Sequence, residues 1–430
     1  MPRLALLLAW MLVVLAGCAG NQQKPIYKPV SELKGCQPDE CVEAKLAFRH
    51  WADAPFYKGR MLYHCDPGSE LDGRPDPQVT RLIVAIHGVV GVKASTFREL
   101  DEAPGLLQLR NVTRAMREAK QRDPSFDPDS VAIIAPTFQR DEEWQPYTDE
   151  DPRVWTWKRS SFNQGNNAVY RENRVGWVKA EEVSSFDVLD EFLRAALIKF
   201  PRLETIVLVG HSTGGQTVHR YALAGVGIHE RLTHEGIEVR YMPANGGGFV
   251  FPSPVRKLPP GQSSLRSNAG RGDNSNWRFT TPRGCKGYDD WGRGLGNIAD
   301  HERLTRAAEY AIDHYLKPHD RKLARKARSQ GIGSKTWAHA ARLALRLQYA
   351  SRQIWHFQAA TDREPKYEEC TADLQGRSRY ERFSNFQQLW TEQNEIPTDN
   401  LHFVALTDAS HPHSSRVVYT SDAGVHVLFF

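Results

Sequence analysis

A short glycine-rich segment, Gly210-His211-Ser212-Thr213-Gly214-Gly215, is the part of the sequence best suited to carry out chemistry. It follows the apolar residues 206–209, which favour a buried strand, and it precedes residues 216–223, which favour a helix. A serine in a sharp turn between a strand and a helix needs small neighbours, because bulk on either side would block the close approach of the two elements. The helix adds backbone N–H groups and a positive dipole, which favour the negative charge that develops on an attacked carbonyl oxygen. This pattern predicts that Ser212 is a nucleophile.

A nucleophilic serine also needs a base, and a carboxylate that orients the base. When the serine lies in such a turn, the acid and then the histidine follow it in the chain, each at the C-terminal end of a strand. Asp362 and the two histidines His411 and His413 meet this requirement, because they follow apolar segments that favour strands. We expect the histidine to take the proton of Ser212, and Asp362 to orient the ring and stabilise its imidazolium form.

Other acidic residues fit this role less well. Asp289 and Asp290 lie in a Gly- and Trp-rich segment with no strand before it. The strand that ends at Met242 is followed by Asn245 in place of a carboxylate. Asp362 is therefore the acid that we expect in the site.

The attacked carbonyl oxygen needs two backbone donors, which form an oxyanion hole. The residue after the nucleophile supplies one, so the N–H of Thr213 is the first candidate. His87-Gly88-Val89 ends an earlier buried strand, where the chain would pass the nucleophile, and the N–H of Val89 is the second candidate. We expect His87 itself to be structural.

The elements that must position these residues alternate along the chain. Continuous apolar segments favour buried strands, and amphipathic spacing favours helices between them. The strand candidates are residues 82–86, 131–135, 206–209, 237–242, 354–360 and 401–406, and the helix candidates are 97–119, 181–200 and 216–223. This alternation, together with the turn at Ser212, predicts an α/β-hydrolase fold with a doubly wound, mostly parallel sheet and helical or irregular cap insertions.

The composition divides the chain into three parts. Residues 1–17 read as a lipoprotein signal peptide, residues 18–75 as a tether and an irregular N-terminal segment, and residues 76–430 as the hydrolase domain with an insertion at about 246–350. Within that insertion, residues 246–296 predict a long irregular excursion outside the core. Helical periodicity returns at residues 302–350, where a basic stretch reads as a solvated helix face or as a membrane-surface or anionic-ligand patch.

The N-terminus has the features of an export signal. Arg3 precedes the apolar residues 4–16, which are too few to span a membrane, and small residues precede Cys18. Leu15-Ala16-Gly17-Cys18 resembles the bacterial lipobox, in which the cysteine is lipidated, although a plain signal peptide with a chance cysteine is the alternative. Because Ala19 and not aspartate follows Cys18, we expect a lipid-anchored protein of the bacterial cell envelope, in the outer membrane and facing the periplasm.

An exported chain is permitted to form disulfides. We expect Cys285 to pair with Cys370, and one bridge among Cys36, Cys41 and Cys65, although sequence does not determine connectivity. No paired cysteines or Cys-His cluster favours a metal site. The net charge of +5 is too small to argue for nucleic-acid binding.

At this point the chain resembles a group of bacterial and fungal α/β hydrolases over about residues 80–425, apart from the helical insertion. The matching stretches are 183–190, 210–221, 241–246, 287–294 and 369–383, and the last contains a Cys-x-Ala-x-x-Gln-Gly-x-x-Arg-x-x-Arg pattern that begins at Cys370. The resemblance implies that Asp362 is the catalytic acid. It also favours His413 over His411, because the family's histidine is typically followed about eight residues later by a serine, and Ser421 has this spacing from His413.

An intact serine–acid–histidine set predicts acyl transfer through an acyl-enzyme, most simply the hydrolysis of a carboxylic ester, with no cofactor and no metal. The substrate would be a small ester or acyl compound. Trp144, Trp155, Trp157 and Trp177 either line its pocket or pin a long loop to the core. The alternative is an inactive envelope lipoprotein that uses the same fold as a binding scaffold, which predicts a broken set of catalytic residues.

Overall fold

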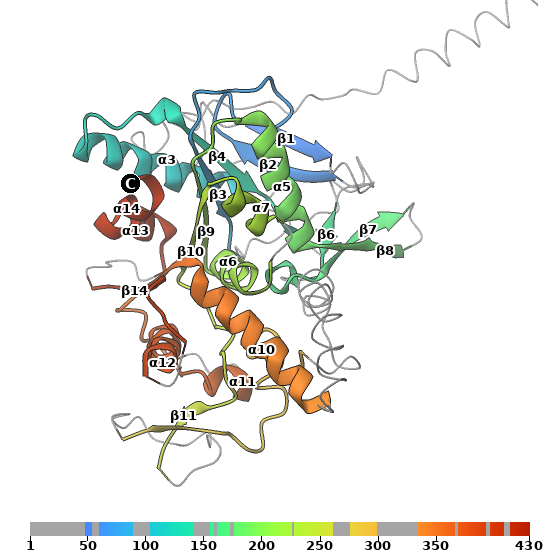
Figure 1. Cartoon of the computed structure of the whole chain (residues 1–430), viewed down its shortest axis with the longest axis vertical. Coiled ribbons are helices and arrows are strands. Elements are labelled where there is room, and N and C mark those ends of the chain that lie inside the picture. The colour runs from blue at the N-terminus through green and yellow to red at the C-terminus, as the bar shows by residue number, and fades with distance from the viewer. Residues whose placement is uncertain are drawn as a thin grey trace, which may run out of the picture. The chain divides into compact units, whose positions relative to one another are not determined.

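An eight-stranded sheet forms the centre of the protein (Figure 1). The computed structural model describes residues 48–53, 60–88, 104–140, 155–158, 161–172, 176–225, 228–260, 276–298, 334–365, 369–392, 396–407 and 413–430. All of these residues belong to one of the two units into which the chain divides, Leu46–Phe430. Cys18, Cys36, Cys41, Val89, His411 and the basic stretch of the insertion lie outside the described residues.

The strands of this sheet follow one another in the order β1-β2-β4-β3-β9-β10-β13-β14. Strand β2 is antiparallel to both of its neighbours, and all strands from β4 onward are parallel. This order, with a sharp strand–helix turn after the fifth strand, defines the α/β-hydrolase fold that the sequence predicts. The bounds are β1 Phe48–Asp53, β2 Arg60–Cys65, β3 Arg81–Ile86, β4 Val131–Pro136, β9 Thr205–His211, β10 Glu238–Ala244, β13 Gln353–Ala359 and β14 Leu401–Leu406.

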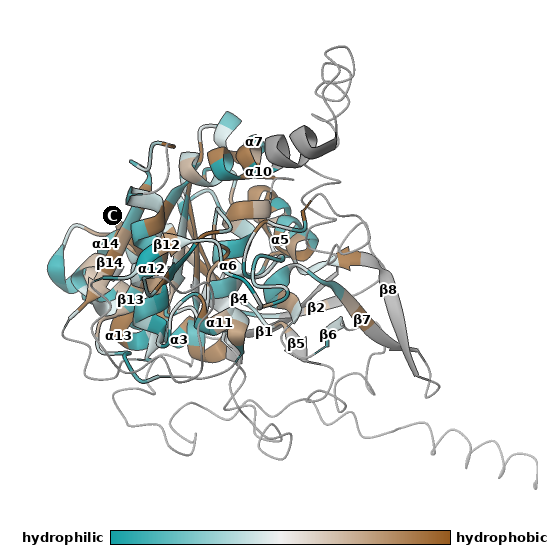
Figure 2. Ribbon diagram, turned by 90° about the horizontal axis from the view of Figure 1, so that it is seen from below, coloured by the Kyte–Doolittle hydropathy of each residue, from teal (hydrophilic) through white to brown (hydrophobic). Residues whose placement is uncertain are grey.

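Helices cover both faces of the sheet, which explains why its central strands are apolar throughout. Side chains alternate between the two faces, so Leu82 and Val84 of β3 enter one core cluster while Ile83 and Ala85 enter the other. Figure 2 shows the apolar strands between the helices. The first cluster contains residues of α5 (Ser185–Lys199), α6 (Thr213–Ala224), α10 (Ser334–Ser351) and α12 (Arg379–Glu392). The second contains residues of α3 (Pro104–Arg122), α13 (Ser415–Thr420) and α14 (Asp422–Phe429).

Shorter elements decorate this frame. Two further sheets consist of β5-β6-β7-β8 and β11-β12. Their strands are β5 Gln139–Arg140, β6 Thr156–Trp157, β7 Asn167–Glu172, β8 Gly176–Ser184, β11 Arg256–Leu258 and β12 Arg278–Thr280, and the short helices are α7 His229–His234, α11 Cys370–Asp373 and the 3₁₀ turns Pro128–Ser130 and Ser161–Gln164. Within the described part of the chain, no helix is both long enough and apolar enough to span a membrane.

Helix α5 begins later than its periodicity predicts, because local hydrogen bonds define its start. Ser184 Oγ accepts the N–H of Phe186, and the carboxylate of Asp187 accepts the N–H of Ser184 at 2.9 Å. This capping box fixes the first turn. Residues 181–184, expected in the helix, instead complete β8.

The expectation of an irregular segment throughout residues 18–75 is wrong for β1 and β2. These strands form the edge of the main sheet, and all six residues of each are paired. Every second residue of β2 points into the core, namely Met61, Tyr63 and Cys65. A search for continuous apolar runs misses this signal, because an antiparallel edge strand alternates with a period of two.

The excursion expected at residues 246–296 has little regular structure, but the expectation that it lies outside the core is wrong. Phe249, Phe251 and Trp291 are buried in it. Beyond the short β11–β12 ladder, buried side chains bond to its backbone groups. The buried guanidinium of Arg256 donates to the carbonyl oxygens of Ser253, Tyr288 and Arg293, and the amide of Gln375 both accepts from the N–H and donates to the carbonyl of Phe249.

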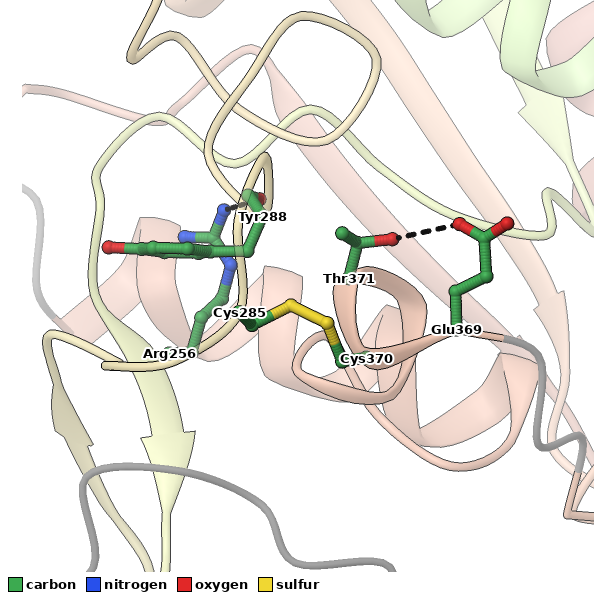
Figure 3. The surroundings of a disulfide bond; sticks show 6 residues. All are labelled: Arg256, Cys285, Tyr288, Glu369, Cys370 and Thr371. Atoms are coloured by element: carbon green, nitrogen blue, oxygen red, sulfur yellow. Dashed lines mark hydrogen bonds between the residues drawn. A yellow bond between two sulfur atoms is a disulfide. The ribbon is translucent and has the colours of Figure 1, made fainter.

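A disulfide joins this excursion to α11, as the sequence predicts. Cys285 and Cys370 are bonded, and Figure 3 shows the bridge between the loop that carries Tyr288 and the start of α11. Cys65 is a free, buried thiol. Cys36 and Cys41 lie outside the described residues, so the second predicted bridge stays a prediction.

We expect loss of the Cys285–Cys370 bridge to destabilise the fold. The bonded residues are 85 positions apart, and releasing a constraint over a loop of this size lowers the free energy of unfolding by about 2–5 kcal/mol. Urea unfolding of the wild type with and without reductant measures this difference. A Cys285→Ser, Cys370→Ser variant should already be destabilised and should not respond to reductant. A full response in that variant would assign the effect to another bridge.

Candidate active site

Ser212 occupies a strained turn between β9 and α6. Its backbone has φ 57° and ψ −118°. Ser212 and Asn245 are the only non-glycine residues with positive φ among those described. Ser212 N–H donates to the carbonyl of Ala244, at the end of β10, at 2.9 Å. Such strain persists where surrounding contacts enforce it, and it projects the serine side chain out of the turn.

The glycines around Ser212 are required by close backbone packing. A Cβ atom at Gly210 would lie 2.3 Å from the carbonyl oxygen of Gly214. At Gly214 it would lie 2.1 Å from the oxygen of Ile86, and at Gly215 it would lie 2.4 Å from the oxygen of Ala244. Helix α6 therefore packs against the ends of β3 and β10 without room for a side chain.

The predicted base lies next to the predicted nucleophile. His413 Nε2 is 3.2 Å from Ser212 Oγ, within hydrogen-bond distance. His413 precedes α13, beyond the C-terminal end of β14, and about a third of its side chain is exposed. The competing candidate His411 lies outside the described residues.

The predicted acid is buried on the far side of the imidazole. Asp362 follows β13, and its backbone carbonyl accepts the N–H of Tyr380 in α12. Its Oδ2 is 3.8 Å from His413 Nδ1, longer than a hydrogen bond. Arg379 contacts both groups, with Nη1 at 3.3 Å from Asp362 Oδ2 and 3.2 Å from His413 Nδ1. The competing acid Asp289 instead pairs with the buried Arg256.

Asn245 and His211 support the base, and the sequence did not indicate either role. Asn245 Oδ1 accepts the N–H of Ala359, which leaves its Nδ2 to donate to His211 Nε2 at 3.2 Å. Burial, and to a smaller extent the charges of His413 and Arg379, holds the pKa of His211 well below its usual range. The neutral ring of His211 packs against that of His413, with centroids 4.7 Å apart.

The proposed oxyanion donors are described only in part. Thr213 is the first residue of α6, so its N–H is one of the donors that a helix leaves without an intrahelical acceptor. Val89 lies outside the described residues. The preceding Gly88 is close to the nucleophile, because a Cβ atom there would lie 3.0 Å from Ser212 Cβ. The chain after β3 thus passes the serine where the sequence predicts.

His87 is structural, as expected. Its Nε2 accepts the N–H of Phe138 at 2.8 Å, so Nδ1 carries the proton and donates to the carbonyl of Gly88, also at 2.8 Å. Burial lowers the pKa of His87 to about 4 and keeps the ring neutral. Phe138 and Phe162 pack beside the ring. His87 therefore ties the loop after β3 to the loop after β4.

Of the tryptophans considered as pocket residues, Trp155 and Trp157 lie in the core. Trp157 Nε1 donates to the carbonyl of Asn166, and its ring packs against Phe138. These contacts favour the interpretation that Trp157 pins a long loop to the core. No group of three or more His, Cys, Asp or Glu side chains is arranged to hold a metal ion in the part of the chain that the structure describes.

Comparison with known proteins gives similar folds only. No protein-family model matches the chain, and no curated protein matches it in sequence. Among solved structures, the poly(3-hydroxybutyrate) depolymerase LpqC from Bordetella parapertussis is 15% identical, with a TM-score of 0.41 over 90% of this chain and 96% of that one. Poly(aspartic acid) hydrolase-1 from Sphingomonas sp. KT-1 is 14% identical, with a TM-score of 0.42 over 89% and 98%. The siderophore hydrolase EstB from Aspergillus nidulans is 11% identical, with a TM-score of 0.37 over 89% and 95%. The fold assignment therefore rests on the strand order and on the turn at Ser212.

We expect Gly214→Ala to disrupt the turn. The added Cβ would meet the carbonyl oxygens of Ile86 and His87 at 2.1 and 2.6 Å, and overpacking of this kind costs about 1–3 kcal/mol or more. Thermal unfolding and reaction with a fluorophosphonate probe test this expectation. Gly246→Ala is the matched control, because its Cβ would meet its nearest neighbours at 3.7 and 3.9 Å, which is ordinary contact. Equal behaviour of the two variants would contradict the packing argument.

Proposed function

We propose that the protein is a serine hydrolase that cleaves carboxylic esters or related acyl compounds through an acyl-enzyme on Ser212. The observation that carries the proposal is the 3.2 Å contact between Ser212 Oγ, in its strained turn, and His413 Nε2. A nucleophile within hydrogen-bond reach of a histidine, with a carboxylate behind that histidine, is the arrangement that acyl transfer requires. Asp362 is the carboxylate behind His413.

In the proposed reaction, Ser212 Oγ attacks the carbonyl carbon of the substrate while His413 Nε2 takes the hydroxyl proton. The resulting oxyanion accepts hydrogen bonds from the N–H of Thr213 and, in our proposal, of Val89. His413 then protonates the departing alcohol. In a second cycle the same nitrogen takes a proton from water, which attacks the acyl-enzyme and releases a carboxylic acid and free Ser212.

The scaffold hypothesis receives less support. It predicts that at least one of Ser212, Asp362 and His413 is missing. All three are present, and each lies just beyond the C-terminal end of a strand.

We expect Ser212→Ala and His413→Ala to abolish ester hydrolysis. Loss of a nucleophile or base in such a set lowers kcat by about 10⁴-fold or more, and p-nitrophenyl esters of short and long acids measure this loss. Labelling by a fluorophosphonate probe should disappear in Ser212→Ala. His411→Ala is the matched control and should keep its activity. Loss of activity in His411→Ala alone would transfer the role of base to His411, and a wild type that neither hydrolyses esters nor takes up the probe would favour the scaffold.

We also propose that Cys18 carries lipid and anchors the protein in the bacterial envelope, in the outer membrane and facing the periplasm. The short apolar segment, the lipobox-like residues before Cys18 and the alanine after it support this proposal.

We expect Cys18→Ser to prevent lipidation. The wild type should incorporate labelled palmitate and partition into a detergent phase, because acyl chains add apolar surface that a soluble domain lacks. The variant should do neither and should stay in the aqueous phase. Cys65→Ser serves as the control for cysteine loss, and palmitate incorporation that survives in Cys18→Ser would refute the assignment.

A further inference from the structure

Arg379 contacts both the acid and the base of the proposed site from one side. Its Nη1 lies 3.3 Å from Asp362 Oδ2 and 3.2 Å from His413 Nδ1, while these two atoms are 3.8 Å apart. In a working serine–histidine–acid triad, the N–H at Nδ1 of the histidine donates directly to the carboxylate. Here the guanidinium of Arg379 contacts both the carboxylate of Asp362 and the ring of His413.

This arrangement fixes the proton on His413. A guanidinium only donates hydrogen bonds and stays charged, so Nδ1 must be the acceptor at 3.2 Å. The proton of the neutral ring is then on Nε2, which donates it to Ser212 Oγ. In this tautomer His413 cannot take the proton of Ser212. The contact with Arg379 therefore holds the base in a resting form.

Arg379 differs from the fully buried arginines of the described chain. Arg220, Arg256, Arg352 and Arg382 are fully buried and donate to backbone carbonyl groups. The side chain of Arg379 is 16% exposed, at the start of α12, and it contacts the two catalytic side chains. It is thus open to a competing partner from solvent.

We propose that Arg379 binds an anionic group of the substrate, a carboxylate on the acyl chain of the ester, and that this binding releases His413. The proposal rests on the proposed function and adds a substrate class to it. A carboxylate can accept two parallel N–H bonds from a guanidinium, and this draws the donors of Arg379 away from His413 Nδ1. Asp362 can then accept Nδ1–H, and the free lone pair of Nε2 faces Ser212. A neutral ester lacks the group that triggers this change.

The test compares two substrates matched in chain length, p-nitrophenyl hexanoate and mono-p-nitrophenyl adipate, with the purified full chain. We expect kcat/KM of the wild type to be at least about tenfold higher for the adipate, as a charge-assisted hydrogen bond implies. Arg379→Met should abolish this preference and raise hydrolysis of the hexanoate, because the guanidinium then no longer contacts Nδ1. Arg379→Lys should keep part of the preference, because lysine keeps the charge but lacks the paired N–H donors of the guanidinium.

Several outcomes would overturn the inference. These are a wild type without the preference, a preference that survives in Arg379→Met, or a fall in hexanoate hydrolysis in that variant. If Arg379→Met does not fold, as judged by circular dichroism, an undiminished preference in Arg379→Lys contradicts the proposal. A protein that hydrolyses both esters equally keeps its proposed function and loses this inference. A protein that hydrolyses neither and takes up no fluorophosphonate loses both.

Discussion

The tight turn at Ser212 imposes the constraint on which the surrounding structure depends. A serine at φ 57° is in a backbone region that side chains avoid, at a cost of order 1–3 kcal/mol. The turn is held because Ser212 N–H bonds to Ala244 and because glycines let α6 touch the ends of β3 and β10. Central strands buried on both faces provide the rigid support that such a turn needs.

The ends of the central strands are also tied to one another beyond their ladders. Asn245, at the end of β10, bonds to Phe357 and Ala359 of β13 and to His211 of β9. The ring of His211 then packs against His413. The neutral groups of Asn245 and His211 thus support His413 without placing a charge beside it.

Much of this frame could be predicted from local sequence. The strands near residues 82–86 and 131–135 are continuous apolar segments, and the glycines around Ser212 identify the turn without knowledge of the fold. Chain order and strand ends were sufficient to select Asp362 and the pair His411 and His413, and the resemblance to known hydrolases then favoured His413. These predictions succeed because each depends on residues close together in sequence, or on a rule of chain order.

What could not be predicted depends on contacts between distant segments. Strands β1 and β2 are defined by their pairing with each other and with β4. Asn245 was noted only as a missing acid, although asparagine tolerates positive φ better than most residues, which is a usable signal. Arg379 belonged to a recognised pattern, but its contacts with Asp362 and His413 follow from how α12 docks on β13.

The segment from Cys370 to Arg382 links three parts of the molecule that could otherwise vary separately. Its first residue is bonded to the excursion through the disulfide, Gln375 grips the backbone at Phe249, and Arg379 touches the acid and the base. The same short stretch that contacts Asp362 and His413 therefore also anchors the excursion. Over evolutionary time, such a layout lets the tips of the excursion change in length and composition, while its anchor points must change together with the site or not at all.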